Sequence, residues 1–225
     1  MNDFMAGVVR AAVETFEFPA PILEVGSYQV AGQERIANLR GHFPRKHYVG
    51  IDMRGGPGVD SVENVEQLPR GDRSIGSVLA LNLFEHVERF WRGFDEVQRV
   101  LRRDGVLLVS CPFHLHIHAY PNDYWRFTPE AFQLLLDKLP TKIIGFHGPA
   151  NRPLDVWAIA FGSDYSQITE PQYQRFRQLV GQYARQPLPW KNRLRYRMGR
   201  LICGRGPFAP YLDAEHFDTE LIRAA

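Results

Sequence analysis

Cysteine is scarce in this chain, and other features it lacks narrow its class further. Two cysteines among 225 residues cannot form the disulfide framework of a small secreted domain. No apolar run approaches the roughly 20 residues that a helix needs to cross a bilayer. The first residues lack a basic segment followed by a small-residue cleavage site, so the sequence predicts no signal peptide. We therefore expect a cytoplasmic protein.

Acidic residues are missing from one long stretch near the C-terminal end. From residue 171 to residue 212 there are nine Lys or Arg and no Asp or Glu, which leaves 18 basic and 25 acidic residues elsewhere. Apolar residues recur there at helical spacing. We expect a main domain over residues 1–165 and a basic helical extension over residues 166–225 packed on it. An anionic membrane surface or self-association is the expected use of this extension, and nucleic acid is not an expected partner.

Short apolar strands alternate with helical segments along the main domain. Hydrophobic composition of 44% and aromatic composition of 12% are enough to build a core. Strands are predicted at 21–27, 47–52, 59–65, 75–81, 105–110, 142–146 and 155–161, and helices at 3–15, 33–39, 89–103 and from 129. This alternation predicts an α/β fold, a Rossmann-like, mostly parallel sheet with helices on both faces. The strand at 155–161 is expected to return antiparallel at the sheet edge.

Two predicted strands end in residues that suit a nucleoside ligand. Gly26 permits close backbone approach after the first strand, and Asp52 ends the second strand with a carboxylate for ribose hydroxyls. Nicotinamide-dependent oxidoreductases use the same pair. The first strand is not followed by Gly-x-Gly-x-x-Gly, so an oxidoreductase is the less favoured interpretation.

Five sequence blocks carry a more specific signal. They lie at residues 22–27, 48–52, 66–69, 81–87 and 99–105. In order and spacing they resemble the class I S-adenosylmethionine-dependent methyltransferases, over about residues 20 to 162. The segments Gly-Pro-Gly-Val-Asp at 56–60 and Asn-Asp-Tyr-Trp-Arg-Phe-Thr-Pro at 122–129 are similar to a bacterial, methyltransferase type 11-like subgroup. That subgroup implies modification of small molecules, surface glycans or natural products.

The resemblance implies S-adenosylmethionine as the cofactor and a donor site. Its residues would be Glu24, Gly26, Ser27, Asp52, Asn64, Val65 and Asn82. Asp52 would hold the ribose, and Asn64 with the Val65 backbone would meet the adenine. Tyr28 stands where the family commonly has a second glycine, and Asn64 where it has an acid, so weaker donor binding is expected. These departures leave open a catalytically degenerate domain that serves as an interaction module.

The segment from 113 to 128 is expected to form the acceptor side. Its candidates for binding the acceptor are His116, Tyr124, Trp125 and Arg126. The expected reaction is O-methylation of a small-molecule or saccharide acceptor, with His118, Asp123 or His86 as the base. An equally weighted alternative is a latch, in which Trp125 and Phe127 pin the loop to the sheet and Asp123 pairs with Arg126.

A run of alternate histidines raises the question of a metal. On a strand, His114, His116 and His118 would share one face and could converge on zinc. The run follows Pro112, where a regular strand is not expected, and no carboxylate or cysteine supplies an obvious further ligand. We therefore expect no metal centre from this run. Glu85 is interpreted as structural, because an acid is favourable at a helix N-terminus.

Overall fold

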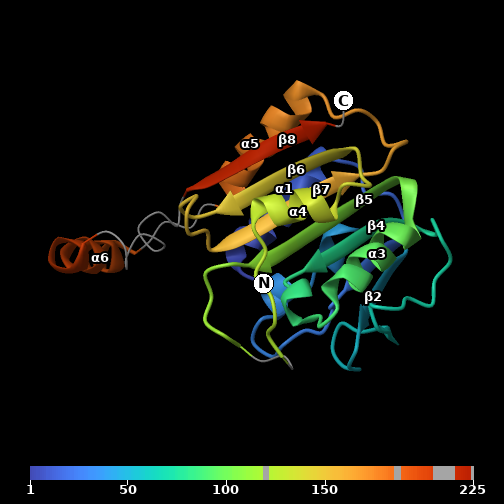
Figure 1. Cartoon of the computed structure of the whole chain (residues 1–225), viewed down its shortest axis with the longest axis horizontal. Helices are drawn as coiled ribbons and strands as arrows, with labels where there is room; N and C mark the ends of the chain where they lie inside the picture. Colours follow the sequence, from blue (N-terminus) through green and yellow to red (C-terminus); the bar gives the residue numbers. More distant parts are fainter. Residues whose placement is uncertain (119–121, 185–188, 205–215, 224–225) are drawn as a thin grey trace.

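The fold is built on one eight-stranded sheet. The computed structural model describes residues 1–118, 122–184, 189–204 and 216–223. The strands are β1 (Ile22–Val25), β2 (Tyr48–Asp52), β3 (Ser61–Val62), β4 (Ile75–Leu81), β5 (Leu101–Pro112), β6 (Thr141–His147), β7 (Asp155–Phe161) and β8 (Phe217–Arg223). Their order across the sheet is β3-β2-β1-β4-β5-β7-β6-β8 (Figure 1). The predicted α/β class with a Rossmann-like sheet is confirmed.

The sheet changes character halfway across. Strands β3, β2, β1, β4 and β5 pair in parallel, whereas β7 runs antiparallel to β5 and to β6, and β8 runs antiparallel to β6. The strand at 155–161 is therefore antiparallel as expected, but it lies inside the sheet. The edge is formed by β8, which the sequence did not predict. Its Asp218 and Glu220 alternate with the half-buried Phe217 and Leu221, and strict alternation over one short segment is a weak signal.

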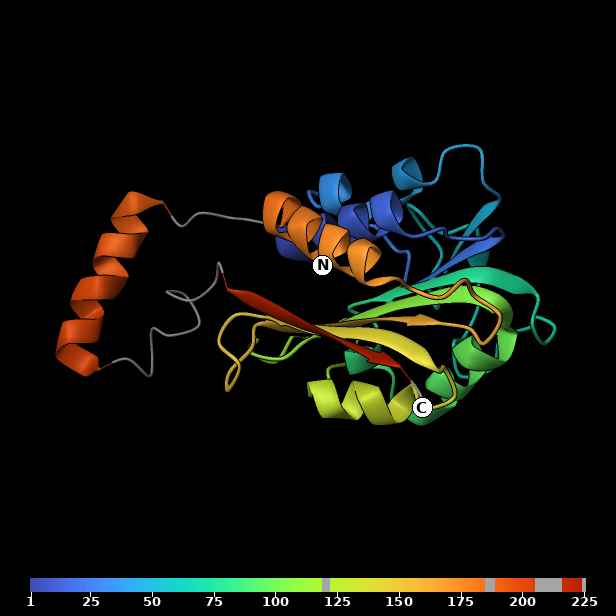
Figure 2. The same ribbon diagram turned by 90° about the horizontal axis from the view of Figure 1, so that it is seen from above.

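Helices cover both faces of the sheet. They are α1 (Asp3–Thr15), α2 (Glu34–Ala37), α3 (Phe90–Val100), α4 (Pro129–Leu135), α5 (Glu170–Tyr183) and α6 (Trp190–Cys203), with the 3-10 turns η1 (Arg40–His42) and η2 (Phe84–His86). Helices α1 and α5 lie together on one face, and α3 and α4 lie on the other (Figure 2). A Cβ on Gly7 would lie 2.5 Å from Cα of Ala184, so glycine permits the close approach of α1 to the end of α5.

The predicted helix at 89–103 is too long at its C-terminal end. Helix α3 ends at Val100, and residues 101–104 already belong to β5. Leu101 continues the apolar spacing of Val97, which explains the misassignment, but its backbone pairs with Ile75 of β4. The next pair is Ser77 with Val106, so β5 bulges between Leu101 and Val106. A tertiary contact thus overrides local helical periodicity here.

The C-terminal extension has three different parts. Helix α5 buries Phe176, Leu179 and Val180 in the core that it shares with α1, and β8 joins the sheet. Helix α6 has no buried residue and lies apart from the sheet in both views (Figures 1 and 2). The division of the chain near residue 165 stays a prediction.

Within the described ranges, none of the helices combines the length and apolarity that a bilayer crossing requires. The cytoplasmic location stays a prediction.

Candidate active site

A cavity of about 660 Å³ lies where β1, β2, β4 and β5 reach their carboxyl ends. The predicted site residues that line it are Glu24, Gly26, Ser27, Asp52, Val65, Asn82, His86 and His118. Six other predicted site residues are not part of its described lining: Asn64, His116, Asp123, Tyr124, Trp125 and Arg126. The cavity spans the junction between β1 and β4, where the strand order reverses, and this is the usual ligand position in open α/β sheets.

The loop after β1 brings the main chain to the cavity. Gly26 has φ +83°, a left-handed conformation that favours glycine. The amides of Gly26 and Ser27 both donate to the carbonyl oxygen of Ile51, at 2.8 and 3.0 Å, and this ties the loop to β2. The Ser27 hydroxyl is buried and has no hydrogen-bond partner among the described residues. Its oxygen lies toward β2, 2.8 Å from where a Cβ on Gly50 would stand.

Glycines of the segment at 56–60 accommodate the departure at Tyr28. A Cβ on Gly56 would lie 2.5 Å from the Tyr28 ring, and a Cβ on Gly58 would lie 2.5 Å from the carbonyl oxygen of Ser27. The guanidinium of Arg54 stacks over the same ring at 4.5 Å. The Tyr28 ring thus packs against Arg54 and against Gly56, where any side chain would clash with it.

Asp52 and Asn64 have different surroundings. The Asp52 carboxylate lines the cavity with 16% of the side chain exposed, and its Oδ1 accepts a hydrogen bond from the Arg54 amide at 3.0 Å. The Asn64 oxygen already accepts the Glu66 amide at 2.9 Å and stabilises a turn outside the cavity. The buried neighbour of Asn64, Val65, does reach the cavity.

Glu24 is a buried acid on the donor side of the cavity. Its carboxylate accepts a hydrogen bond from the Tyr48 hydroxyl at 2.6 Å. Burial raises the pKa of Glu24 to about 7, although the Tyr48 hydrogen bond acts in the opposite direction. Asn82, at the end of β4, has φ +50°, and its side-chain oxygen accepts a hydrogen bond from the Ser110 hydroxyl at 3.0 Å. This bond holds the ends of β4 and β5 together.

The aromatic segment after β5 has the geometry of a latch. The Trp125 indole donates to the carbonyl oxygens of Val87 and Glu88 at 3.1 and 3.2 Å. The Tyr124 amide donates to the Glu85 carbonyl oxygen at 2.7 Å. Phe127 is buried against α3. These bonds hold the η2 turn, and with it Glu85 and His86, against the wall of the cavity.

Asp123 belongs to this latch as a paired anion. Its carboxylate is 1% exposed, pairs with the Arg126 guanidinium and accepts the His118 amide at 2.9 Å. The Arg126 hydrogen bonds hold the pKa of Asp123 well below its usual range. An anion that is already saturated by donors is a poor proton acceptor, so the structure does not favour Asp123 as the base.

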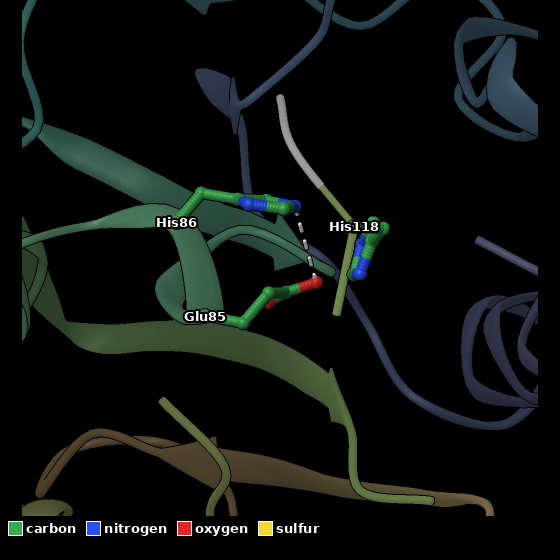
Figure 3. A group of neighbouring side chains, drawn as sticks. All are labelled: Glu85, His86 and His118. Carbon is green, nitrogen blue, oxygen red and sulfur yellow. Dashed lines mark ion pairs between the residues drawn. The ribbon is translucent and has the colours of Figure 1, made fainter. Parts of the chain in front are cut away.

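Three side chains converge at the other end of the cavity (Figure 3). Glu85, His86 and His118 offer atoms that all lie within 4.8 Å of one another. Glu85 is buried, and neither of its carboxylate oxygens has a hydrogen-bond partner among the described residues. Burial raises the pKa of Glu85 to about 7 and lowers the pKa of His86. The interpretation of Glu85 as a structural acid did not place it at the cavity. The sequence signal that could have indicated this position is an acid directly before His86 in an apolar block.

The three alternate histidines do not share one site. His114 lines the cavity, where its Nδ1 accepts a hydrogen bond from Arg152 at 3.3 Å. His116 is exposed and lies outside the described cavity lining. Only His118 joins Glu85 and His86.

Comparisons with known proteins agree with this arrangement. Residues 25–109 match the family model described as a methyltransferase domain. A SAM-dependent methyltransferase from Archaeoglobus fulgidus superposes with a TM-score of 0.54 at 13% identity, covering 70% of this chain and 92% of that one. A 1,6-didemethyltoxoflavin-N1-methyltransferase from Burkholderia thailandensis, solved with bound 1,6-didemethyltoxoflavin and S-adenosylhomocysteine, has a TM-score of 0.50 at 18% identity, covering 70% of this chain and 79% of that one. No curated protein matches the sequence.

Sheet order, cavity position and the matched domain define the class I methyltransferase fold. The chain has the fold of S-adenosylmethionine-dependent methyltransferases and matches a methyltransferase domain over residues 25–109.

Proposed function

We propose that the chain transfers the methyl group of S-adenosylmethionine to a hydroxyl oxygen of a small-molecule or saccharide acceptor. One observation carries this proposal. A single cavity joins the loop of Gly26 and the carboxylate of Asp52 at one end to the imidazoles of His86 and His118 at the other. The first end has the groups that a nucleoside needs, and the second has groups that handle a proton.

The donor end fits S-adenosylmethionine on its own geometry. Gly26 lets the main chain approach, Ser27 follows it in the cavity lining, and Asp52 can accept from ribose hydroxyls. Glu24, Val65 and Asn82 complete the proposed donor wall, and Asn64 stays a proposal from the resemblance alone. When bound, S-adenosylmethionine supplies a methyl group already activated by the sulfonium sulfur. The protein therefore mainly aligns the two reactants and excludes water.

The histidine end is suited to an acceptor that must lose a proton. The Nδ1–H of His86 donates to the carbonyl oxygen of Asn122, which leaves the lone pair of Nε2 available. Burial lowers the pKa of His86, so the ring is neutral near pH 7 and can take the hydroxyl proton. His118 is the second candidate. Because the half-exposed Tyr124 and Trp125 lie beyond the described lining, they would contact only parts of an acceptor that extend past the cavity, as would His116 and Arg126.

A binding experiment separates the proposed class from its alternatives. Calorimetry should show stoichiometric binding of S-adenosylhomocysteine and none of NADH. Preferential NADH binding would instead support an oxidoreductase, and absence of both would support a degenerate domain.

A transfer assay then tests the accepting atom. The protein would be incubated with S-adenosylmethionine and panels of glycosides, phenols and amines, with release of S-adenosylhomocysteine as the signal. We expect hydroxyl acceptors to react and His86→Ala to lower kcat at unchanged S-adenosylhomocysteine affinity. His47→Ala is the matched control, because His47 is exposed and lies before β2, at the opposite end of the sheet. Turnover of amines alone would overturn O-methylation.

For helix α6 we propose an anionic membrane surface as the partner. Its exposed apolar residues are Trp190, Leu194, Met198, Leu201 and Ile202. Its charged residues are all basic: Lys191, Arg193, Arg195, Arg197 and Arg200. A helix with an apolar stripe and only positive charge suits a negatively charged lipid surface.

Vesicle sedimentation tests this partner. The whole chain should sediment with phosphatidylserine-containing vesicles and not with pure phosphatidylcholine, and Leu201→Asp should abolish binding. Leu134→Asp is the control, because Leu134 is another largely exposed leucine, on α4. A concentration-dependent dimer that α6 substitutions dissociate, without vesicle binding, would support self-association instead.

A further inference from the structure

The proposed function leaves Glu85, a buried acid in the cavity wall, without a role. Its side chain is completely buried, and both oxygens lack a hydrogen-bond partner among the described residues. The Cys111 thiol and the Glu85 main-chain amide act on its carboxylate from outside hydrogen-bond geometry, and the Met1 ammonium and the Arg126 guanidinium act on it through their charge. A buried carboxylate without hydrogen bonds is unfavourable unless a cation or a proton compensates it.

Two histidines lie next to Glu85. Nδ1 of His86 is occupied by the carbonyl oxygen of Asn122, and its Nε2 lies 3.7 Å from Oε1 of Glu85. Nδ1 of His118 lies 3.0 Å from the Asp123 carboxylate, at ion-pair distance but outside hydrogen-bond geometry. Nε2 of His86 is therefore available, and the three side chains point toward one another (Figure 3).

Outer partners of this kind are typical of metal-binding histidines. A histidine that ligates through one nitrogen usually engages a carbonyl or carboxylate with the other, which sets the orientation of its ring. Asn122 provides the carbonyl for His86. For His118, the Asp123 carboxylate accepts the main-chain amide and lies at ion-pair distance from ring Nδ1. Asp123 is itself held by Arg126, so the whole support is built from the 122–126 segment. The latch segment therefore also orients the two histidines.

We propose that Glu85, His86 and His118 form a binding site for a divalent transition-metal cation at the acceptor end of the cavity. One carboxylate and two imidazoles suit zinc, manganese or iron(II) better than magnesium, which prefers oxygen ligands. All three residues line the cavity, so the remaining coordination positions face the space of the acceptor.

The consequence for the reaction rests on the proposed function. With a cation bound, the two histidines would hold the cation, and the cation would activate the hydroxyl in place of the His86 base of the metal-free site. A hydroxyl oxygen bound to the cation loses its proton more readily, and water at the cavity mouth takes that proton. An acceptor with two neighbouring hydroxyls, as in a saccharide, can occupy two coordination positions at once.

Metal titration of the chelator-treated whole chain tests the site without an acceptor. We expect about one Zn²⁺ or Co²⁺ per chain by calorimetry, with the Co²⁺ absorption spectrum of a site that contains imidazole ligands. Glu85→Gln and His118→Ala should each weaken binding at least 10-fold. His116→Ala is the matched control, because it removes a neighbouring histidine that lies outside the cluster. Magnesium should bind at least 10-fold more weakly than Zn²⁺.

The result that overturns the site differs from the result that overturns the proposed function. Absence of stoichiometric Zn²⁺ and Co²⁺ binding, or unchanged binding in both cluster variants, rules out the site. Loss on His116→Ala equal to the loss on His118→Ala would assign the metal to the histidine run instead. S-adenosylhomocysteine affinity, measured on the same samples, reports the donor site independently and confirms that each variant is folded. If Glu85→Gln does not fold, His86→Ala and His118→Ala carry the test.

Discussion

The two ends of the cavity are constructed in different ways. The proposed donor wall consists of glycine-shaped main chain after β1 and β2 with the Glu24 and Asp52 carboxylates, and main-chain hydrogen bonds between neighbouring strands hold it. The proposed acceptor wall consists of imidazoles and a carboxylate on η2 and on the segment after β5. Its supports come from a loop outside the sheet, because His86 is held by the carbonyl oxygen of Asn122. A main-chain wall suits a constant ligand, whereas a side-chain wall can be changed by single substitutions.

A large effect on stability should follow from adding a side chain behind the donor wall, at Gly50 of β2. In Gly50→Ala, the new Cβ would lie 2.4 Å from the Gly58 carbonyl oxygen and 2.8 Å from the Ser27 hydroxyl. We expect the free energy of unfolding to fall by about 1 to 3 kcal/mol, because no flexible group can give way. Chemical denaturation measures this. Gly71→Ala, whose Cβ would meet nothing within 4 Å, should stay within about 0.5 kcal/mol of the parent, and equal losses would contradict the steric argument.

Removing the Asp52 carboxylate should show that donor affinity depends on one wall of the cavity and not on the other. Asp52→Ala should weaken S-adenosylhomocysteine binding by about 1.5 to 3 kcal/mol, roughly 10- to 100-fold, because charge-assisted hydrogen bonds to the ribose are lost. Calorimetry measures the affinity. His118→Ala, on the acceptor wall, should leave it unchanged. If both variants lose donor affinity equally, the cavity is not divided in this way.

Glu24 should make stability depend on pH. Its pKa of about 7 in the folded chain lies above the ordinary value of 4.5, so the folded state holds a proton that the unfolded state releases. The resulting stabilisation is full below about pH 4.5, falls as the pH rises and is lost above about 7. Unfolding of the parent and of Glu24→Gln should be compared across this window. The parent should lose stability relative to Glu24→Gln as the pH rises, and parallel pH profiles would contradict the assignment.

The smallest effect is expected at Asn64. Its oxygen stabilises a turn and does not reach the described cavity lining. We expect Asn64→Ala to change S-adenosylhomocysteine affinity less than about twofold and to cost about 0.5 to 1 kcal/mol of stability through the lost turn hydrogen bond. A loss of affinity like that of Asp52→Ala would restore the adenine contact that the family resemblance implies.

Predictability follows the range of the interactions. Gly26 and Asp52 were predicted because each ends a strand, and strand ends are visible in a local apolar pattern. The sequence did not predict strand β8 or the end of α3 at Val100, because both depend on pairing with strands that are distant in the sequence. Asp123 was proposed as a base from its residue type. Its saturation by Arg126 and the His118 amide became visible only in three dimensions.

Apolar strands and ordered motifs are local properties of the chain. They were therefore enough to predict the parallel half of the sheet, the positions of Gly26 and Asp52 and the class of methyl donor. Only the tertiary structure decided that Tyr28 packs against Gly56, that Asp123 is a latch residue and that Glu85 meets His86 and His118. Burial is the reason that Glu85 stands out only in the folded chain. A carboxylate is an ordinary residue in a sequence, and it demands a partner only after folding has removed its water.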